Sequence, residues 1–182
     1  MKNVLIKVPD QKIPLIKDAA VICGHLKLLP HPEGGWFREV YRSDEILSTG
    51  ALPGRYKEAH NVSTSIYFLL ESNDFSAFHR IRSDETWHFY KGSPVKLYII
   101  TTEGKLLDVI LGNNLNDGQL LQFTITRNCW FAAKVVEENS YSLVGCTVAP
   151  GFEFADFELG KRHQLEELFP HMQQLINEFT RF

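Results

Sequence analysis

Cysteine is scarce in this 182-residue sequence, and neither sign of charge predominates. Cys23, Cys129 and Cys146 are odd in number and far apart, which fits neither a disulfide framework nor a zinc cluster. Lys and Arg total 19 and Asp and Glu total 22, for a formal net charge of -3. A chain so nearly balanced has no basic surface for nucleic acid or for an anionic membrane, so we expect neither partner.

Long apolar runs are also missing. No segment approaches the roughly 18 consecutive apolar residues that a membrane-spanning helix requires. The first residues, "MKNVLIKVPDQK", are interrupted by Lys7, Pro9 and Asp10, so no apolar region of a secretory signal develops. We therefore expect a cytoplasmic protein.

From residue 63 onward, short apolar stretches alternate with turn residues. The expected strands cover residues 63–71, 75–82, 85–92, 95–101, 105–112, 119–126, 129–136 and 141–149. Many short strands in succession, with no helix between them, predict an antiparallel sandwich or barrel. With 44% hydrophobic residues, residues 1–182 are long enough to form a single domain with its own core.

The segments on either side of the expected barrel have other patterns. Apolar positions at near-helical spacing predict a helix over residues 11–24, ending at Gly24. The stretch "WFREVY" is expected to be extended, and residues 44–61 to form a long loop. The last 22 residues have a helical composition, and Pro170 is expected to divide them into a short helix and a second one that it opens.

Candidate functional residues lie in "SAFHRIRSDETWHFYKG", residues 76–92. Side chains alternate between the two faces of a strand, so His79 shares a face with Ile81. After a turn, Glu85 and Trp87 share a face of the next strand. If both faces point inward, His79 and Glu85 meet in a mostly apolar pocket, which is the usual composition of a small-molecule site.

This stretch resembles the first motif of the cupins, G-x5-H-x-H-x3-E-x6-G. His79, Glu85 and Gly92 stand at the motif's spacings, whereas Ile81 replaces the second histidine and Asn73 the first glycine. In the stretch that corresponds to the second cupin motif, Trp130 takes the place of the third metal histidine. The resemblance implies a cupin-type jelly-roll barrel, all-β with short flanking helices at both ends, and a degenerate metal site.

Two further resemblances concern activity. The stretches "HPEGGWFREVY" and "LVGCTVAPGFEFADFELG" are similar to a branch of small single-domain cupins of unknown activity. The Gly-aromatic-x-Glu order also resembles the nucleotide-sugar 3,5-epimerases, which share this barrel, use no metal, and abstract a proton next to a carbonyl with a histidine. Those enzymes carry a lysine soon after that histidine, and the nearest lysine after His79 is Lys91.

Two protein ligands are too few for a tightly held transition metal, so we expect no metal cofactor. A third ligand would have to be His88, which is out of phase with Glu85 on a regular strand. Without metal, a carboxylate beside an imidazole fixes its tautomer and supports general-base catalysis. His79 would then be the base and Glu85 the group that orients it.

The alternatives are a non-catalytic protein that binds or senses a small metabolite, and a weakly metal-dependent enzyme using His79, Glu85 and His88. A further alternative is a purely structural role, in which His79 hydrogen-bonds to a backbone carbonyl and Glu85 forms an ion pair with Arg38 or Arg82. The expected pocket residues besides His79 and Glu85 are Tyr67, Trp87, Trp130 and Arg38. The resemblance to cupins further implies a homodimer, since cupins often pair through sheet edges.

Overall fold

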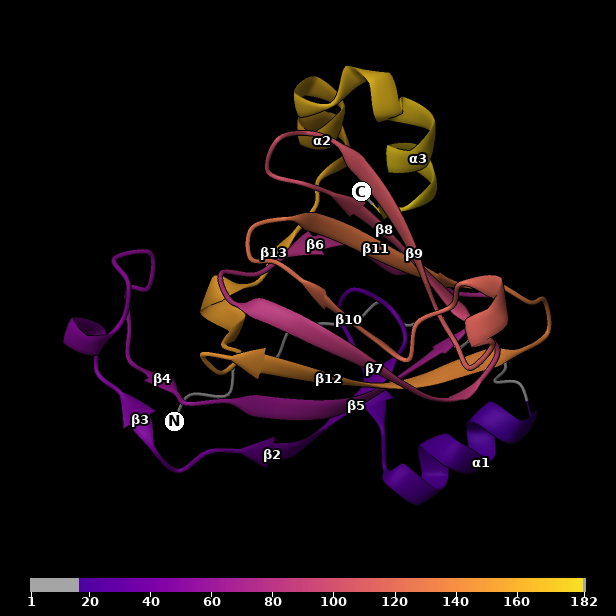
Figure 1. The fold of residues 1–182 in the computed structure, drawn as a ribbon, viewed down its shortest axis with the longest axis horizontal. Helices are drawn as coiled ribbons and strands as arrows, with labels where there is room; N and C mark the ends of the chain where they lie inside the picture. Colours follow the sequence, from indigo (N-terminus) through magenta and orange to yellow (C-terminus); the bar gives the residue numbers. More distant parts are fainter. Residues whose placement is uncertain (1–16, 182) are drawn as a thin grey trace.

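A computed structural model describes residues 17–181, which form two sheets packed face to face with helices at both ends (Figure 1). The strands are β1 Leu29–Pro30, β2 Trp36–Arg42, β3 Ile46–Leu47, β4 His60–Asn61, β5 Thr64–Glu71, β6 Ser76–Arg80, β7 Asp84–Gly92, β8 Val95–Ile100, β9 Leu106–Leu111, β10 Gln122–Ile125, β11 Trp130–Val135, β12 Tyr141–Ala149 and β13 Glu158–Leu159. The helices are α1 Lys17–Leu26, α2 Arg162–Leu168 and α3 Gln173–Glu178, with short 3-10 turns η1 Thr49–Ala51, η2 Leu115–Asp117, η3 Phe154–Asp156 and η4 Pro170–Met172.

The strands pair antiparallel in both sheets. One sheet has six strands in the order β1-β2-β5-β12-β7-β10, and the other has five in the order β13-β6-β11-β8-β9. Consecutive strands β6 and β7 therefore lie in different sheets, joined by the short connection at residues 81–83. This all-β jelly-roll arrangement with flanking helices is the predicted fold class.

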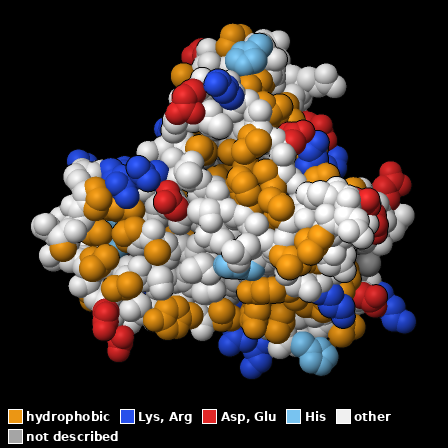
Figure 2. Space-filling view, in the orientation of Figure 1, with side chains coloured by type: hydrophobic (Ala, Val, Ile, Leu, Met, Phe, Trp, Pro, Cys, Tyr) orange, Lys and Arg blue, Asp and Glu red, His pale blue; other side chains and the backbone are white. Residues whose placement is uncertain are grey.

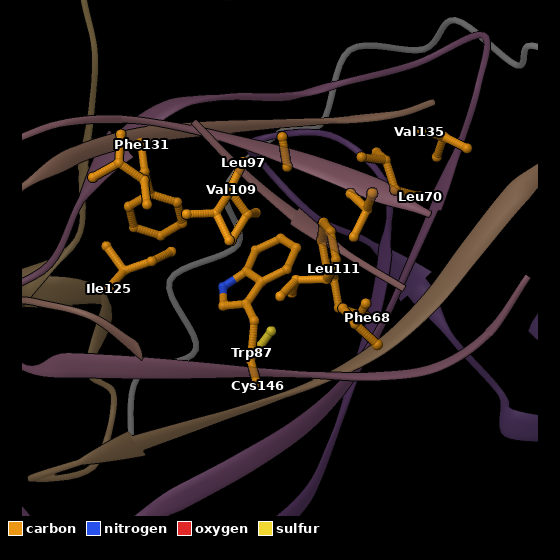
Figure 3. Packing of buried hydrophobic residues seen from close by; sticks show 14 of the residues in the cluster. Phe68, Leu70, Trp87, Leu97, Val109, Leu111, Ile125, Phe131, Val135 and Cys146 are labelled. Carbon is orange, nitrogen blue, oxygen red and sulfur yellow. The ribbon is translucent and has the colours of Figure 1, made fainter. Parts of the chain in front are cut away.

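The main core fills the space between the sheets. Trp87 extends from β7 into this space, where its ring packs edge-to-face against those of Phe68 and Phe131 (Figure 3). Each of these three aromatic side chains is about 1% exposed. Fully burying one large apolar side chain contributes about 1.5–3 kcal/mol, so this cluster is a main source of the fold's stability. A second cluster, which includes Phe78, Trp130 and Phe179, lies under the C-terminal helices.

The predicted strands agree with the observed ones to within three residues at each end, and the helix predictions need adjustment. The predicted helix over residues 11–24 is observed as α1, Lys17–Leu26, while residues 11–16 fall outside the described part. Gly24 does not end this helix, which continues to Leu26 before Lys27 adopts a positive φ of 53°. Pro170 does separate two helices, because η4 begins at Pro170 and leads into α3.

A tight turn at residues 31–35 joins β1 to β2 and carries part of the site described below. Gly34 and Gly35 have φ values of 117° and 68°, which glycine adopts without strain. A Cβ on Gly34 would collide with the carbonyl of Phe75. The Ala77 amide donates to the Glu33 carbonyl at 2.9 Å, so the turn is fastened to β6 of the opposite sheet.

Over residues 17–181, every helix is too short or too polar to cross a membrane.

Candidate functional site

A cavity of about 90 Å³ opens between the two sheets. By the measure that gives a single water about 10–15 Å³, this space holds several waters or one small organic molecule. Its lining residues are His31, Glu33, Phe37, Glu39, Arg42, Thr64, Ile66, Phe68, His79, Ile81, Glu85, Trp87, Cys146, Val148, Phe152, Glu153, Phe154 and Phe157. Apolar walls with a few convergent polar groups are the usual anatomy of a ligand site.

A buried carboxylate, Glu33, is the centre of a polar cluster in this cavity. Its Oε2 lies 3.1 Å from Nε2 of His79 on β6. Ser76, also on β6, donates its hydroxyl to Oε1 at 2.9 Å. The backbone bond from the Ala77 amide to the Glu33 carbonyl holds the turn at this distance from the strand.

His31 is the fourth member of the cluster. Its Nδ1 lies 3.3 Å from Oε2 of Glu33, and the ring packs edge-on against Phe37 and close to the ring of Phe157. The Glu33 amide also donates to Nδ1, at the longer distance of 3.4 Å, so this nitrogen has a donor and the carboxylate acceptor beside it. No group among residues 17–181 hydrogen-bonds to Nε2 of His31, which leaves this nitrogen free for a ligand.

The cluster holds a proton between Glu33 and His79. Nδ1 of His79 donates to the Ala77 carbonyl at 2.8 Å, and Nε2 faces the Glu33 carboxylate, so both ring nitrogens meet acceptors. Burial lowers the pKa of His79 and the Glu33 charge opposes this, but the two-acceptor geometry requires one proton in the Nε2–Oε2 contact. Burial alone would raise the pKa of Glu33, yet the charges of His79 and His31, with hydrogen bonds from His31 and Ser76, lower it to about 2.

Glu85 is the second buried carboxyl, and its surroundings differ. Its Oε1 accepts a hydrogen bond of 3.1 Å from the Trp87 indole, and the Cys146 thiol is a further partner. No Lys or Arg side chain among residues 17–181 forms an ion pair with it. Burial, reinforced by the negative charge of Glu33, raises the pKa of Glu85 to about 8. At neutral pH Glu85 is therefore mainly a carboxylic acid with a proton to donate.

Ionic contacts fasten the wall formed by residues 152–157 at the cavity mouth. Arg42 on β2 bonds to Glu153 at 2.6 Å and to the Phe152 carbonyl at 3.1 Å. His60 on β4 contacts Asp156 in η3 at 2.6 Å. These contacts hold the aromatic rings of this wall against the cavity.

The expected His79–Glu85 pair does not form. Both side chains line the cavity, but His79 contacts Glu33 and Glu85 contacts Trp87. The reason is topological, because β6 and β7 belong to different sheets and are not paired strands. The structural alternative for His79 was right in one respect, since one ring nitrogen does bond to a backbone carbonyl.

Three expected pocket residues lie elsewhere, and Trp87 alone of the expected walls lines the cavity. Tyr67 packs on the outer face of the six-stranded sheet near α1, where its ring meets that of Tyr90. Trp130 points toward the C-terminal helices with Arg80 over its ring, because its neighbour Phe131 occupies the inward phase of β11. Arg38 is outside the cavity and bonds to the Leu26 carbonyl.

Glu33 and His31 were not identified from the sequence. Both belong to "HPEGG", the start of the stretch that resembles small single-domain cupins, which by itself predicts a plain turn and no site residue. In the structure the two side chains are 5% and 8% exposed. The sequence did contain a pattern that could have predicted these two residues. A histidine and a glutamate stand beside paired glycines, and a tight turn at such glycines can bring polar side chains back onto the barrel.

Comparison with known proteins identifies the family. A family model described as Cupin superfamily (DUF985) matches residues 20–160. The chain belongs to the cupin superfamily. Among solved cupin-like structures, protein SO0799 from Shewanella oneidensis is 34% identical with a TM-score of 0.81, over 90% of this chain and 97% of that one. A hypothetical protein from Leishmania major is 32% identical with a TM-score of 0.83, over 90% and 99%.

More distant cupin relatives show the fold alone or carry no assigned activity. The uncharacterized protein YML079W of Saccharomyces cerevisiae is 23% identical over 139 residues, which is 71% of this chain and 69% of that protein. Oxalate decarboxylase from Bacillus subtilis is 12% identical with a TM-score of 0.50, over 82% of this chain and 36% of that one. The protein is thus a cupin whose nearer relatives bear names without a function.

The residues at the cupin metal position do not fit a metal. Among residues 17–181, no three His, Cys, Asp or Glu side chains are grouped so as to hold an ion. His88, the possible third ligand, lies on the outer face of β7 with Gln122 and Thr147 as partners, so the set of His79, Glu85 and His88 is wrong. Instead, Nε2 of His79 contacts Oε2 of Glu33, while Nδ1 of His79 and Oε1 of Glu33 bond to the Ala77 carbonyl and the Ser76 hydroxyl.

Proposed function

We propose that this cupin is a metal-independent enzyme that isomerises a small carbonyl compound by proton transfer. The observation that carries this proposal is Glu85, a buried carboxyl that faces an aromatic cavity and has no Lys or Arg of residues 17–181 beside it. Its pKa of about 8 lies near physiological pH, which suits a group that must both give and take a proton. A purely structural carboxyl would be expected to have a charged partner.

The base in this mechanism is His31 rather than His79. For this role Nδ1 of His31 carries the ring proton and donates it to the Glu33 carboxylate, the shorter of its two contacts, rather than accepting from the Glu33 amide. Nε2 then offers its lone pair to the cavity. His79 has both nitrogens engaged, so it acts as a positioning residue that holds Glu33 in place.

The proton transfer runs through an enol. Nε2 of His31 takes a proton from the carbon next to the carbonyl, and the electron pair of that C–H bond forms the carbon–carbon double bond of the enol. The carbonyl oxygen takes the proton of Glu85 at the same time. The proton on His31 exchanges with solvent, and its return to the opposite face of that carbon, after the enol turns in the cavity, inverts the carbon. Return of the enol proton to Glu85 completes the redox-neutral isomerisation.

Solvent exchange tests this function. In heavy water, the native protein is expected to catalyse deuterium uptake next to the carbonyl of cyclohexanone or acetophenone, followed by NMR. Glu85→Gln and His31→Asn are each expected to slow this uptake by about 100-fold or more, because each removes one proton-transfer group. His88→Asn, on the outer face of the sheet, is the matched control and should keep the native rate.

The competing function is a non-catalytic protein that binds or senses a metabolite. It predicts binding of such ketones with no uptake of deuterium above the buffer rate. Uptake that is equal in the native protein and in both variants would contradict the proposed mechanism.

We also propose that the chain forms a homodimer. Strand β9 is the last strand of its sheet, and apolar side chains are exposed on it and beside it, in the middle of the face shown in Figure 2. They are Leu106, Leu107, Ile110, Leu120 and Leu121. Light scattering should give twice the chain mass of 20.9 kDa, and Leu107→Lys should reduce it to one chain. A native mass of one chain would contradict this proposal.

A further inference from the structure

The hydrogen-bonding capacity left free in the cavity limits what can bind there. Glu33 has at most one acceptor site left, on Oε1, since Oε1 accepts from Ser76 and Oε2 contacts both His79 and His31. A ligand that needs both oxygens of a carboxylate would have to displace one of these buried partners, which costs the desolvation of the group left behind.

The guanidinium of Arg42 is also fully engaged. Nε and one terminal nitrogen hold both oxygens of Glu39, and that terminal nitrogen also reaches the Phe152 carbonyl. The other terminal nitrogen bonds to Asn61 and Glu153. Among residues 17–181 no lysine lines the cavity, so a phosphate or carboxylate would find no free cation in this part of the chain.

The charges at the mouth and in the interior add to this exclusion. Glu39 and Glu153 flank the single guanidinium, and the Glu33 carboxylate lies further in. An entering anion therefore meets like charges in a partly desolvated space, where repulsion is strong. This argues against a sugar nucleotide, whose diphosphate needs cationic partners.

Among the described lining residues, the carboxylic acid of Glu85 and Nε2 of His31 remain open to a ligand. The Thr64 hydroxyl, which accepts from the Phe152 amide, keeps its proton to donate. Most of the remaining interior wall is apolar or aromatic, with Phe37, Ile66, Phe68, Ile81, Trp87, Val148, Phe152, Phe154 and Phe157. A sugar would leave most of its hydroxyls without partners on such a surface. An ammonium inside the cavity would meet Glu85, which is mainly protonated, while the unbound oxygen of Glu153 lies at the exposed mouth. A carbonyl oxygen needs a single donor, and Glu85 supplies one.

We propose that the cavity binds a neutral carbonyl compound with an apolar, ring-like body, and that it excludes anions, amines and sugar nucleotides. This inference rests on the proposed function, because the bound carbonyl is the group that Glu85 protonates. The aromatic walls bury the body of the ligand, and the carbonyl accepts from Glu85.

Four probes of similar size separate the classes: acetophenone, benzoate, benzylamine and ethylbenzene. Calorimetry with the full chain at about pH 6, where Glu85 keeps its proton, should show acetophenone binding at least about tenfold tighter than each of the others. Raising the pH to about 9.5 should weaken acetophenone at least about tenfold, because ionised Glu85 no longer donates. Glu85→Gln keeps an N–H donor, so it should bind acetophenone with little dependence on pH.

Each outcome has a definite meaning. If benzoate or benzylamine binds more tightly than acetophenone, the proposed ligand class is wrong. It is also wrong if benzylamine binding strengthens as Glu85 ionises, because that dependence indicates a site for a cation. Equal binding of ethylbenzene, or no acetophenone binding by protein whose thermal unfolding is cooperative, overturns it as well. Acetophenone binding without deuterium uptake leaves the ligand class intact and defeats the proposed catalysis, so the two failures are distinguishable.

Discussion

At about pH 9, Glu85→Gln is expected to be more stable than the native protein, by at most about 5 kcal/mol. The pKa of Glu85 rises from 4.5 in the unfolded chain to about 8 in the fold. Between these values the folded state binds more protons than the unfolded one, so the stability of the native protein falls as the pH rises and levels off above about 8. Glutamine keeps the shape and the Trp87 contact but carries no ionisable proton.

Chemical denaturation, followed by tryptophan fluorescence at about pH 5 and about pH 9, measures this difference. Near pH 5 the two proteins should have almost equal free energies of unfolding, because the native carboxyl is neutral there. Glu138→Gln, at an exposed position, is the matched control and should follow the native protein at both values. Parallel curves for Glu85→Gln and the native protein would show that Glu85 is not held protonated by the fold.

The opposite effect is expected at Glu33. With a folded pKa of about 2 against 4.5 when unfolded, its carboxylate adds about 3 kcal/mol of stability above pH 4.5. Glu33→Gln should lose about this amount at pH 7, because His79, which shares a proton with Glu33, then faces a neutral amide. Two Glu-to-Gln changes in one cavity should thus move stability in opposite directions.

The pH dependence provides the check on this second variant. The free energy of unfolding of the native protein should fall as the pH drops from about 4.5 to about 2, because Glu33 and other carboxylates become protonated. In Glu33→Gln this free energy should fall less over the same pH range, because the contribution of Glu33 is missing. Glu39→Gln is a suitable control, because Glu39 is half-exposed and an ion pair of this kind contributes at most about 1 kcal/mol. A Glu33→Gln variant as stable as the native protein at pH 7 would contradict the role assigned to the buried cluster.

The fold was predictable from local pattern, and the site only in part. Alternation of apolar residues between turns located eight strands, because burying one face of a strand constrains every second residue. His79 and Glu85 both reach the cavity for the same reason, since each is in phase with the inner face of its own strand.

The partners of these two residues were not predictable. Which strands share a sheet depends on long-range pairing, and the assignment of β6 and β7 to different sheets separates His79 from Glu85. Trp130 shows a related limit: both Trp130 and Phe131 are apolar, so composition could not tell which one faces inward. Glu33 enters through a turn of paired glycines, whose path is fixed by contacts with Phe75 and Asp74 from a distant part of the chain.

The placement of β6 and β7 in separate layers has an evolutionary consequence. The residues at 81–83 are the direct covalent link between the strand that bears His79 and the strand that bears Glu85. The spacing of the two layers is otherwise set by interior side chains such as Leu97 and Leu111. Enlarging or trimming such a residue would shift His79 relative to Glu85, so drift in the hydrophobic filling can change the shape of the cavity while every residue that lines it stays unchanged.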